Sequence, residues 1–100
     1  MHYRFDFEWD EEKNRINQMK HGVSFEEAVM VFSDNKRVEV FDKKHSLFEE
    51  RWKMFGLSGL NVLIVNFTER RGLIRIISAR KANRKEEEAY YHGYGKTHNN

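Results

Sequence analysis

The sequence predicts a single α+β domain with two N-terminal helices, a sheet of about four antiparallel strands and a C-terminal helix. Three observations lead to this prediction. The chain has 100 residues, 39% hydrophobic and 34% charged, a balance typical of one globular domain. Apolar residues recur at helical spacing in the first third. In the second half, apolar and polar residues alternate within short segments that are separated by glycine-containing turns. We expect the domain to span residues 1–91 and a flexible tail to span residues 92–100.

The first predicted helix runs from Asp10 to His21. Asp10 is a suitable N-cap, and the two glutamates that follow it suit the positive end of the helix dipole. Gly22 fits the position after the last turn, where a left-handed backbone ends many helices. Ile16 and Met19 form a narrow apolar stripe, by which we expect this helix to pack.

The second predicted helix begins at Ser24, which forms a capping box with Glu27. Its apolar residues fall on one face: Phe25, Ala28, Val29 and Phe32. A third helix is expected over residues 82–91, with Asn83 and Glu86 at the same capping spacing. Each of these two helices therefore has a defined start.

Four strands are predicted between the second and third helices, over residues 37–42, 51–57, 62–68 and 73–79. Gly56–Gly59 and Arg70–Gly72 are expected to be hairpin loops. A further short strand over Tyr3–Phe7 and a helical turn within residues 42–50 are left open.

Alternation along these strands predicts two unlike faces. The face under the helices is expected to carry Val38, Val40, Trp52, Met54, Ile74 and Ile76. The opposite face is expected to carry Arg37, Arg51, Lys53 and Arg75. Such a cationic sheet face suits a nucleic-acid backbone.

The charge distribution is uneven although the net charge is only +2. Seven basic residues and no acid lie between Arg70 and Lys85, namely Arg70, Arg71, Arg75, Arg80, Lys81, Arg84 and Lys85. This segregation favours binding of a polyanion over a merely solvated surface.

Composition also excludes several classes of protein. There is no cysteine for a disulfide or a thiolate metal site, and the five histidines lack close ligand spacing. The longest apolar run, Val62–Val65, is too short to span a membrane, and the first residues lack the apolar core of a signal peptide. We expect a cytoplasmic protein with no metal and no cofactor.

A helix-turn-helix DNA-binding domain is one alternative, because two helices are joined at His21–Ser24. The second helix would then read the bases. It carries two glutamates and no arginine, lysine, asparagine or glutamine. Its charge argues against sequence-specific DNA binding.

Motifs spread in order over residues 7–91 resemble those of the BrnT toxins. They are Phe7-Glu-Trp-Asp10, Lys13, Asn17 and Lys20-His-Gly-Val-Ser-Phe-Glu-Glu-Ala28, then Asp42, His45-Ser46, Glu49-Glu-Arg51 and Gly56, then Thr68-Glu-Arg70, Arg75-Ile-Ile-Ser-Ala-Arg80, Ala82 and Glu86. The resemblance implies a RelE-like fold and a toxin that cleaves RNA and arrests growth. It also implies a BrnA-like ribbon-helix-helix antitoxin, with operator DNA bound only through the toxin–antitoxin complex.

Metal-independent RNA cleavage requires a base for the ribose 2′-OH, an acid for the leaving 5′-oxygen and cations for the phosphate. The motif-matched cations are Arg51, Arg70 and Arg80, of which Arg80 is preferred. The candidate acid and base groups are His21, His45, Glu50 and Glu69. Further contacts to RNA are expected from Lys53, Arg75, Lys81 and Arg84.

Several of these residues have a second interpretation. His21 also suits a cation that stabilises the end of the first helix. For Glu50 and Glu69, holding a neighbouring arginine in place is favoured over proton transfer. A RelE-like module that binds RNA or a protein without catalysis therefore stays open as an alternative.

Overall fold

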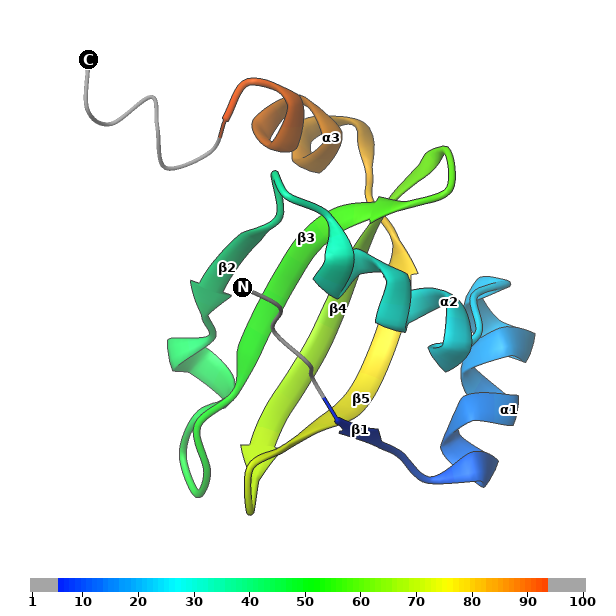
Figure 1. The fold of residues 1–100 in the computed structure, drawn as a ribbon, viewed down its shortest axis with the longest axis vertical. Coiled ribbons are helices and arrows are strands. Elements are labelled where there is room, and N and C mark those ends of the chain that lie inside the picture. Colours follow the sequence, from blue (N-terminus) through cyan, green and yellow to red (C-terminus); the bar gives the residue numbers. More distant parts are fainter. Residues whose placement is uncertain (1–5, 94–100) are drawn as a thin grey trace.

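The computed structural model describes residues 6–93. Three helices are present, α1 (Glu11–His21), α2 (Phe25–Met30) and α3 (Arg84–Tyr91). The strands are β1 (Phe7–Glu8), β2 (Val38–Phe41), β3 (Trp52–Ser58), β4 (Asn61–Arg70) and β5 (Leu73–Lys81). Two 3₁₀ turns, η1 (Val31–Ser33) and η2 (Lys43–His45), complete the described elements. The α+β class and the order of the helices agree with the prediction (Figure 1).

The strands form one mixed sheet of five strands in the order β1-β5-β4-β3-β2. β1 runs parallel to β5, and the other pairs are antiparallel. The expectation of about four antiparallel strands was therefore too simple. β1 has only two residues, too few for an alternation to mark it in the sequence. Tyr3–Phe5 of the tentative first strand lie outside the described residues.

The predicted ends of α1 and α2 are confirmed by their hydrogen bonds. The Asp10 carboxylate accepts from the N–H groups of Glu12 and Lys13, and Gly22 has φ 69°. Ser24 and Glu27 form the reciprocal capping box that starts α2. α2 is shorter than expected, because the chain tightens into η1 after Met30.

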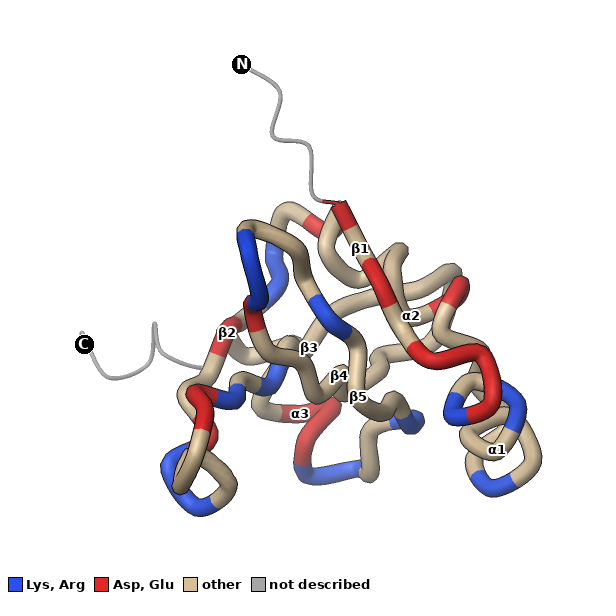
Figure 2. The backbone as a smooth tube through the Cα atoms, turned by 90° about the horizontal axis from the view of Figure 1, so that it is seen from below, with Lys and Arg blue, Asp and Glu red and all other residues tan. Residues whose placement is uncertain are grey.

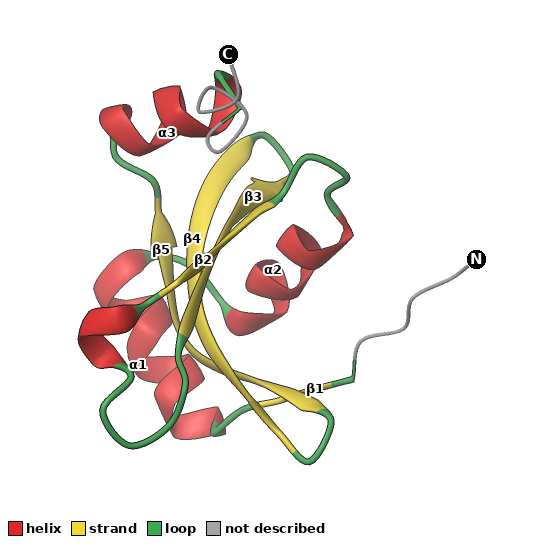
Figure 3. Ribbon diagram, turned by 90° about the vertical axis from the view of Figure 1, so that its left-hand side faces the viewer, coloured by secondary structure: helices red, strands yellow, loops and turns green. Residues whose placement is uncertain are grey.

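The hydrophobic core lies on the side of the sheet that α2 and η1 cover (Figure 3). Its strand residues include Met54, Val65, Phe67, Ile74 and Ile76. The Phe32 ring joins helix and sheet, with its centroid 5.0 Å from that of Phe7 and 5.1 Å from that of Phe67. The predicted inward positions in β3 and β5 are confirmed.

The predicted faces of β2 are wrong. Val38 pairs with Phe55, and Val40 pairs with Lys53, so both valines lie on the face of Lys53 rather than on the core face. Arg37 accordingly lies on the helix side, against Phe32 and Met54. β2 is an edge strand, and its own alternation does not reveal which face its neighbour buries.

A register shift between Asn66 and Phe67 changes the faces of β5. Asn66 pairs with Ser78 and Phe67 with Ile76, which leaves Ile77 without a pairing partner in β4. Beyond this bulge, Ala79 points into the core. Ser78 and Arg80 therefore join Lys53 and Asn66 on the face opposite the core, called the polar face below.

The α1 helix contributes buried asparagines instead of the expected apolar stripe. Ile16 and Met19 are exposed, whereas Asn14 and Asn17 are buried. The Asn17 amide donates 2.8 Å hydrogen bonds to the carbonyls of Val23 and Ala79 and accepts from the Ala79 N–H. Asn17 thereby satisfies backbone groups at the edge of β5, at a position beyond the two β5 residues that pair with β1.

The hairpin prediction was half correct. Arg71 and Gly72, both with positive φ, form the two-residue turn between β4 and β5. Gly56, however, lies within β3, where an added Cβ would be 2.7 Å from Cγ1 of Val31. The first hairpin turn is instead Gly59–Leu60. Gly56 thus allows η1 to pack closely on the sheet.

Helix α3 lies at the end of the sheet remote from the β4–β5 turn (Figure 1). Asn83 and Glu86 form the predicted capping box, although the helix starts at Arg84 rather than at residue 82. The Tyr90 hydroxyl donates a hydrogen bond to Asp34, in the loop before β2. Residues 94–100 of the expected tail lie outside the described residues.

Candidate functional site

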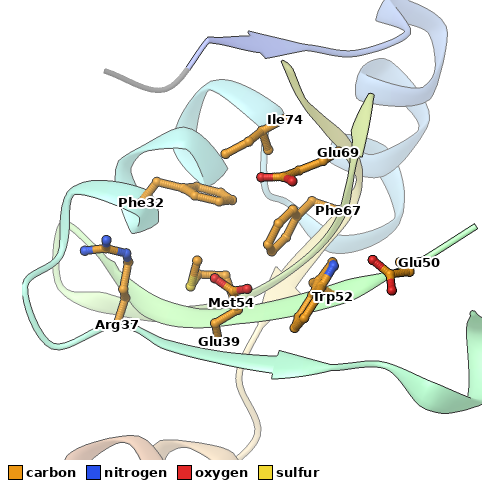
Figure 4. A pocket seen from close by; sticks show the side chains of 9 residues that line it. All are labelled: Phe32, Arg37, Glu39, Glu50, Trp52, Met54, Phe67, Glu69 and Ile74. Atoms are coloured by element: carbon orange, nitrogen blue, oxygen red, sulfur yellow. The ribbon is translucent and has the colours of Figure 1, made fainter. Parts of the chain in front are cut away.

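An acidic groove opens on the helix side of the sheet (Figure 4). It has a volume of about 130 Å³ and an apolar floor of Phe32, Trp52, Met54, Phe67 and Ile74. Glu39, Glu50, Glu69 and Arg37 line its rim. Three carboxylates against one guanidinium make this groove unfavourable for a phosphate backbone. Glu50, a predicted acid or base, lies here and not on the polar face.

The polar face holds a second cavity, the central cleft, of about 190 Å³. Its lining residues come from the loop after β2 and from β3, β4 and β5: Asp42, His45, Arg51, Lys53, Asn66, Ile77 and Ser78. Register places Lys53, Asn66 and Ser78 side by side on three adjacent strands. The central cleft therefore combines one imidazole, one carboxylate and two permanent cations.

His45 is oriented by Asp42. The 3₁₀ turn η2 starts at Asp42, whose carboxylate accepts both the backbone N–H and the ring Nδ1 of His45, the latter at 2.9 Å. Asp42 is only 8% exposed, whereas 57% of the His45 side chain is exposed. Because Nδ1 is held by the carboxylate, Nε2 is the ring nitrogen left for a ligand.

The Asp42 carboxylate is stabilised in its charged form. Burial alone would raise the pKa of Asp42. The hydrogen bonds from the His45 ring and backbone, together with the charge of Lys53, outweigh burial and hold this pKa below its ordinary value. The Lys53 Nζ atom lies 3.9 Å from Oδ2 of Asp42. Asp42 therefore provides a fixed negative charge behind His45.

A chain of hydrogen bonds crosses the strands beside this pair. Lys53 donates to the Asn66 amide oxygen at 2.9 Å, and the Asn66 amide nitrogen donates to Ser78 Oγ at 2.8 Å. These contacts fix the Lys53 ammonium at the floor of the central cleft.

Two further clefts adjoin the central cleft. The loop cleft, about 580 Å³, shares His45 and Arg51 with it and is also lined by Lys44, Leu47, Phe48, Glu49 and Arg70. The helix cleft, about 180 Å³, shares Ile77 and Ser78 and is also lined by Lys13, Ile16, Asn17, Lys20 and His21. Together the three form a track, called the cleft track, from the loop before β3 to α1.

Acidic side chains from other parts of the chain contact the basic residues of the run at residues 70–85. Arg70 and Arg51 both contact Glu49, at 3.1 and 3.3 Å, and Arg75 lies 3.4 Å from Glu8. Figure 2 shows the acidic segments of β1 and the start of α1, which are distant in sequence from the basic run. The absence of acids from this stretch of sequence does not carry over to the fold, because the fold brings carboxylates from other segments to these arginines.

Arg80 forms the most regular of these ion pairs. Its two terminal nitrogens donate to the two carboxylate oxygens of Glu86, both at 2.8 Å. This hydrogen-bonded pair lowers the pKa of Glu86 despite partial burial. Lys53 also contributes to that lowering, so the Arg80–Glu86 pair lies within electrostatic reach of the central cleft.

The predicted residues thus separate into three groups. His45, Arg51 and Lys53 meet in the central cleft, and Arg70 and His21 line the adjoining clefts. Arg75 and Arg80 are engaged by glutamates. Glu50 lies apart from all of these, in the acidic groove. Lys81 and Arg84 are exposed at the end of β5 and the start of α3, where Arg84 lies 3.7 Å from Glu88.

Sequence reasoning missed Asp42, Asn66 and Ser78 as site residues. Asp42 stands three residues before His45, a spacing that in retrospect indicates a capped turn. Asn66 is the single polar residue in the apolar centre of β4, which was a signal for a buried polar contact. Ser78 carries no comparable signal, because the bulge at Ile77 determines its face.

These features define a class of small α+β protein in which α2 and η1 cover one face of a single sheet, α1 packs on its edge, and polar and cationic residues line clefts on the other face. A family model described as ribonuclease toxin, BrnT, of type II toxin-antitoxin system matches residues 9–86, and the chain belongs to this family. No curated protein matches the sequence. None of the helices within residues 6–93 is long and apolar enough to cross a membrane.

Proposed function

We propose that the protein is a metal-independent endoribonuclease that binds single-stranded RNA along the cleft track and cleaves it in the central cleft. The single observation that carries this proposal is the exposed His45 ring held by buried Asp42 beside Lys53. A proton acceptor, a fixed counter-charge and a phosphate-binding cation are thus gathered in one cavity.

In the proposed reaction, His45 Nε2 takes the proton of the ribose 2′-OH. The O2′ atom then forms a bond to phosphorus while the bond from phosphorus to O5′ breaks. The products are a 2′,3′-cyclic phosphate and a strand with a 5′-OH. Asp42 stabilises the imidazolium that forms, as a carboxylate does behind a histidine base.

Lys53 and Arg51 are the proposed cations for the phosphate in this site. Negative charge grows on the non-bridging oxygens in the transition state, and fixed cations lower its energy. We assign the proton for the leaving O5′ to the Lys53 ammonium, which is held by Asn66. Arg80 is assigned a positioning role through Glu86, whose charge acts on Lys53.

Contacts to the rest of the RNA are assigned to the ends of the cleft track. Arg70 and Lys44 lie in the loop cleft, and His21 and Lys20 lie in the helix cleft. Arg75, Lys81 and Arg84 are retained as outer contacts to phosphates. The acidic groove, on the opposite side of the sheet, is expected to stay free of RNA.

The biological assignments implied by the sequence motifs belong to the same proposal. Family membership supports a toxin that acts on RNA and is paired with an antitoxin. We propose that the fold is RelE-like, that RNA cleavage arrests growth in the cytoplasm, and that a BrnA-like ribbon-helix-helix antitoxin neutralises the toxin. Operator DNA would be bound only by the complex.

The direct test is incubation of the purified chain with naked single-stranded RNA, with and without a chelator. We expect cleavage in both, with cyclic phosphate ends. An otherwise identical RNA with 2′-deoxyribose at the cleaved position should stay intact there, because it lacks the nucleophile. Cleavage that stops when the chelator is added would refute metal independence.

The alternative is a module that binds RNA or the antitoxin without cleaving RNA. The ion pairs of Arg70, Arg75 and Arg80 favour the antitoxin-binding form of this alternative, since a guanidinium already paired with a carboxylate is less available to a phosphate. RNA binding without any cleavage, in the presence or absence of added divalent ions, would establish it.

A further inference from the structure

The loop between η2 and β3 presents two apolar side chains to solvent beside the cations of the loop cleft. Phe48 is 96% exposed and Leu47 is 81% exposed. Phe48 forms no ring contact within residues 6–93. Exposed large apolar residues that line a cleft with charged groups commonly mark a binding surface.

The base of this loop is fastened, so that its tip has a defined place. Ser46 Oγ accepts a 2.9 Å hydrogen bond from the Arg51 N–H and donates one to the Asp42 carbonyl at 2.6 Å. The Glu49 carboxylate is held by Arg51 and Arg70. Phe48 lies between these fastened positions in the chain and lines the loop cleft together with His45.

We propose that Phe48 is a stacking platform for an unpaired RNA base next to the cleaved bond, with Leu47 extending its apolar surface. This inference rests on the proposed function for its ligand. Every base has a π-face that stacks on an aromatic ring, and Arg51, Arg70 and Lys44 lie in the same cleft to hold the phosphates on either side. A base within a duplex is already stacked, so the platform selects single strands.

The loop cleft has the size for such a ligand. Its volume of about 580 Å³ lies within the range of cavities that hold small organic ligands. Its permanent side-chain charges are three cations, on Lys44, Arg51 and Arg70, against the single carboxylate of Glu49. A nucleotide, with an apolar base and an anionic phosphate, matches this pairing of an aromatic surface with cations.

The test is a comparison of Phe48→Ala with Leu60→Ala. Leu60 is also 96% exposed but lies in the turn between β3 and β4, outside the cleft track. The probe is a short single-stranded oligonucleotide, 2′-O-methylated throughout so that it cannot be cleaved, with 2-aminopurine at successive positions. Stacking on a ring quenches its fluorescence.

We expect Phe48→Ala to weaken binding by about tenfold and to abolish the quenching at one position. Leu60→Ala should leave the binding affinity and the quenching unchanged. Phe48→Trp should keep both at the level of the parent protein. The inference would be overturned if Phe48→Ala bound and quenched like the parent protein, or if it weakened only the antitoxin complex. The latter result would make the loop a protein-docking surface.

Failure of this inference is distinguishable from failure of the proposed function. If the parent protein cleaves ordinary RNA, while Phe48→Ala binds and quenches the probe like the parent protein, the platform is disproved and the ribonuclease is kept. Quenching that depends on Phe48, without cleavage of ordinary RNA, disproves the ribonuclease and keeps the platform.

Discussion

At the scale of single residues, the position of His45 depends on Asp42. The Asp42 carboxylate accepts two hydrogen bonds from His45, one from the backbone N–H and one from the ring. The turn and the imidazole are therefore fixed together. His45 was predicted from its polar loop alone. Its orienting carboxylate was not, because the sequence does not show which nearby acidic side chain the ring will face.

Replacement of Asp42 by Asn tests this dependence. The amide oxygen retains one acceptor, but the fixed negative charge is lost. We expect cleavage to slow by about 10²-fold, within the range for a positioned proton-transfer group, and the pH profile of kcat to change. Asp10→Asn is the control, since Asp10 caps α1 outside the cleft track. An unchanged rate and profile for Asp42→Asn would contradict the orienting role.

At the scale of elements, local sequence signals predicted where helices and turns start and end better than which face of the sheet a strand residue occupies. The capping boxes of α2 and α3 and the Arg71–Gly72 turn were predicted correctly, because each depends on residues a few positions apart. The faces of β2 and of the second half of β5 were not. They are determined by the neighbouring strand and by the bulge at Ile77, both of which are long-range properties.

The contrast between local signals and long-range contacts also explains the unexpected role of α1. Helical periodicity predicted that α1 packs through Ile16 and Met19, yet the buried residues of this helix are Asn14 and Asn17. Asn14 accepts the Phe25 N–H at 2.8 Å, and Asn17 pairs with Ala79. Polar residues suit this position because the helix packs on a strand edge, where backbone groups need partners.

The edge contact predicts a large effect for Asn17→Ala. The substitution leaves the N–H and carbonyl of Ala79 and the carbonyl of Val23 without their partner. We expect unfolding free energy to fall by about 3 kcal/mol, measured by chemical denaturation. Met19→Ala, on the exposed side of α1, should cost less than about 0.5 kcal/mol. Equal effects would show that α1 packs through its apolar stripe after all.

At the scale of the whole molecule, carboxylates from distant segments stabilise the fold in their charged form. Burial raises the pKa of Asp34, but hydrogen bonds from Tyr90 and from the N–H groups of Lys36 and Leu57 outweigh it and lower the pKa. The Arg80 hydrogen bonds lower the pKa of Glu86. Asp34 and Glu86 join α3 to the rest of the domain, a feature that no local pattern predicts.

These lowered pKa values predict a loss of stability in acid. The unfolded chain has the ordinary pKa values of 3.8 for Asp and 4.5 for Glu and therefore takes up protons first as the pH falls. Stability should be fully present well above pH 4.5 and should decline below it. Denaturation series at pH 7 and pH 3.5 measure the decline. Glu86→Gln should have a smaller difference between these two pH values than the parent protein, and an equal or larger difference would count against the proposed origin.

The most direct measurement for the central claim is the single-turnover rate of RNA cleavage by His45→Ala, with His92→Ala as the matched control. His92 lies at the end of α3, outside the cleft track. If His45 is the base, its loss should slow cleavage by about 10²- to 10⁴-fold while RNA affinity changes little, and His92→Ala should behave as the parent protein. Cleavage by His45→Ala at the parental rate would contradict a catalytic centre on this face of the sheet.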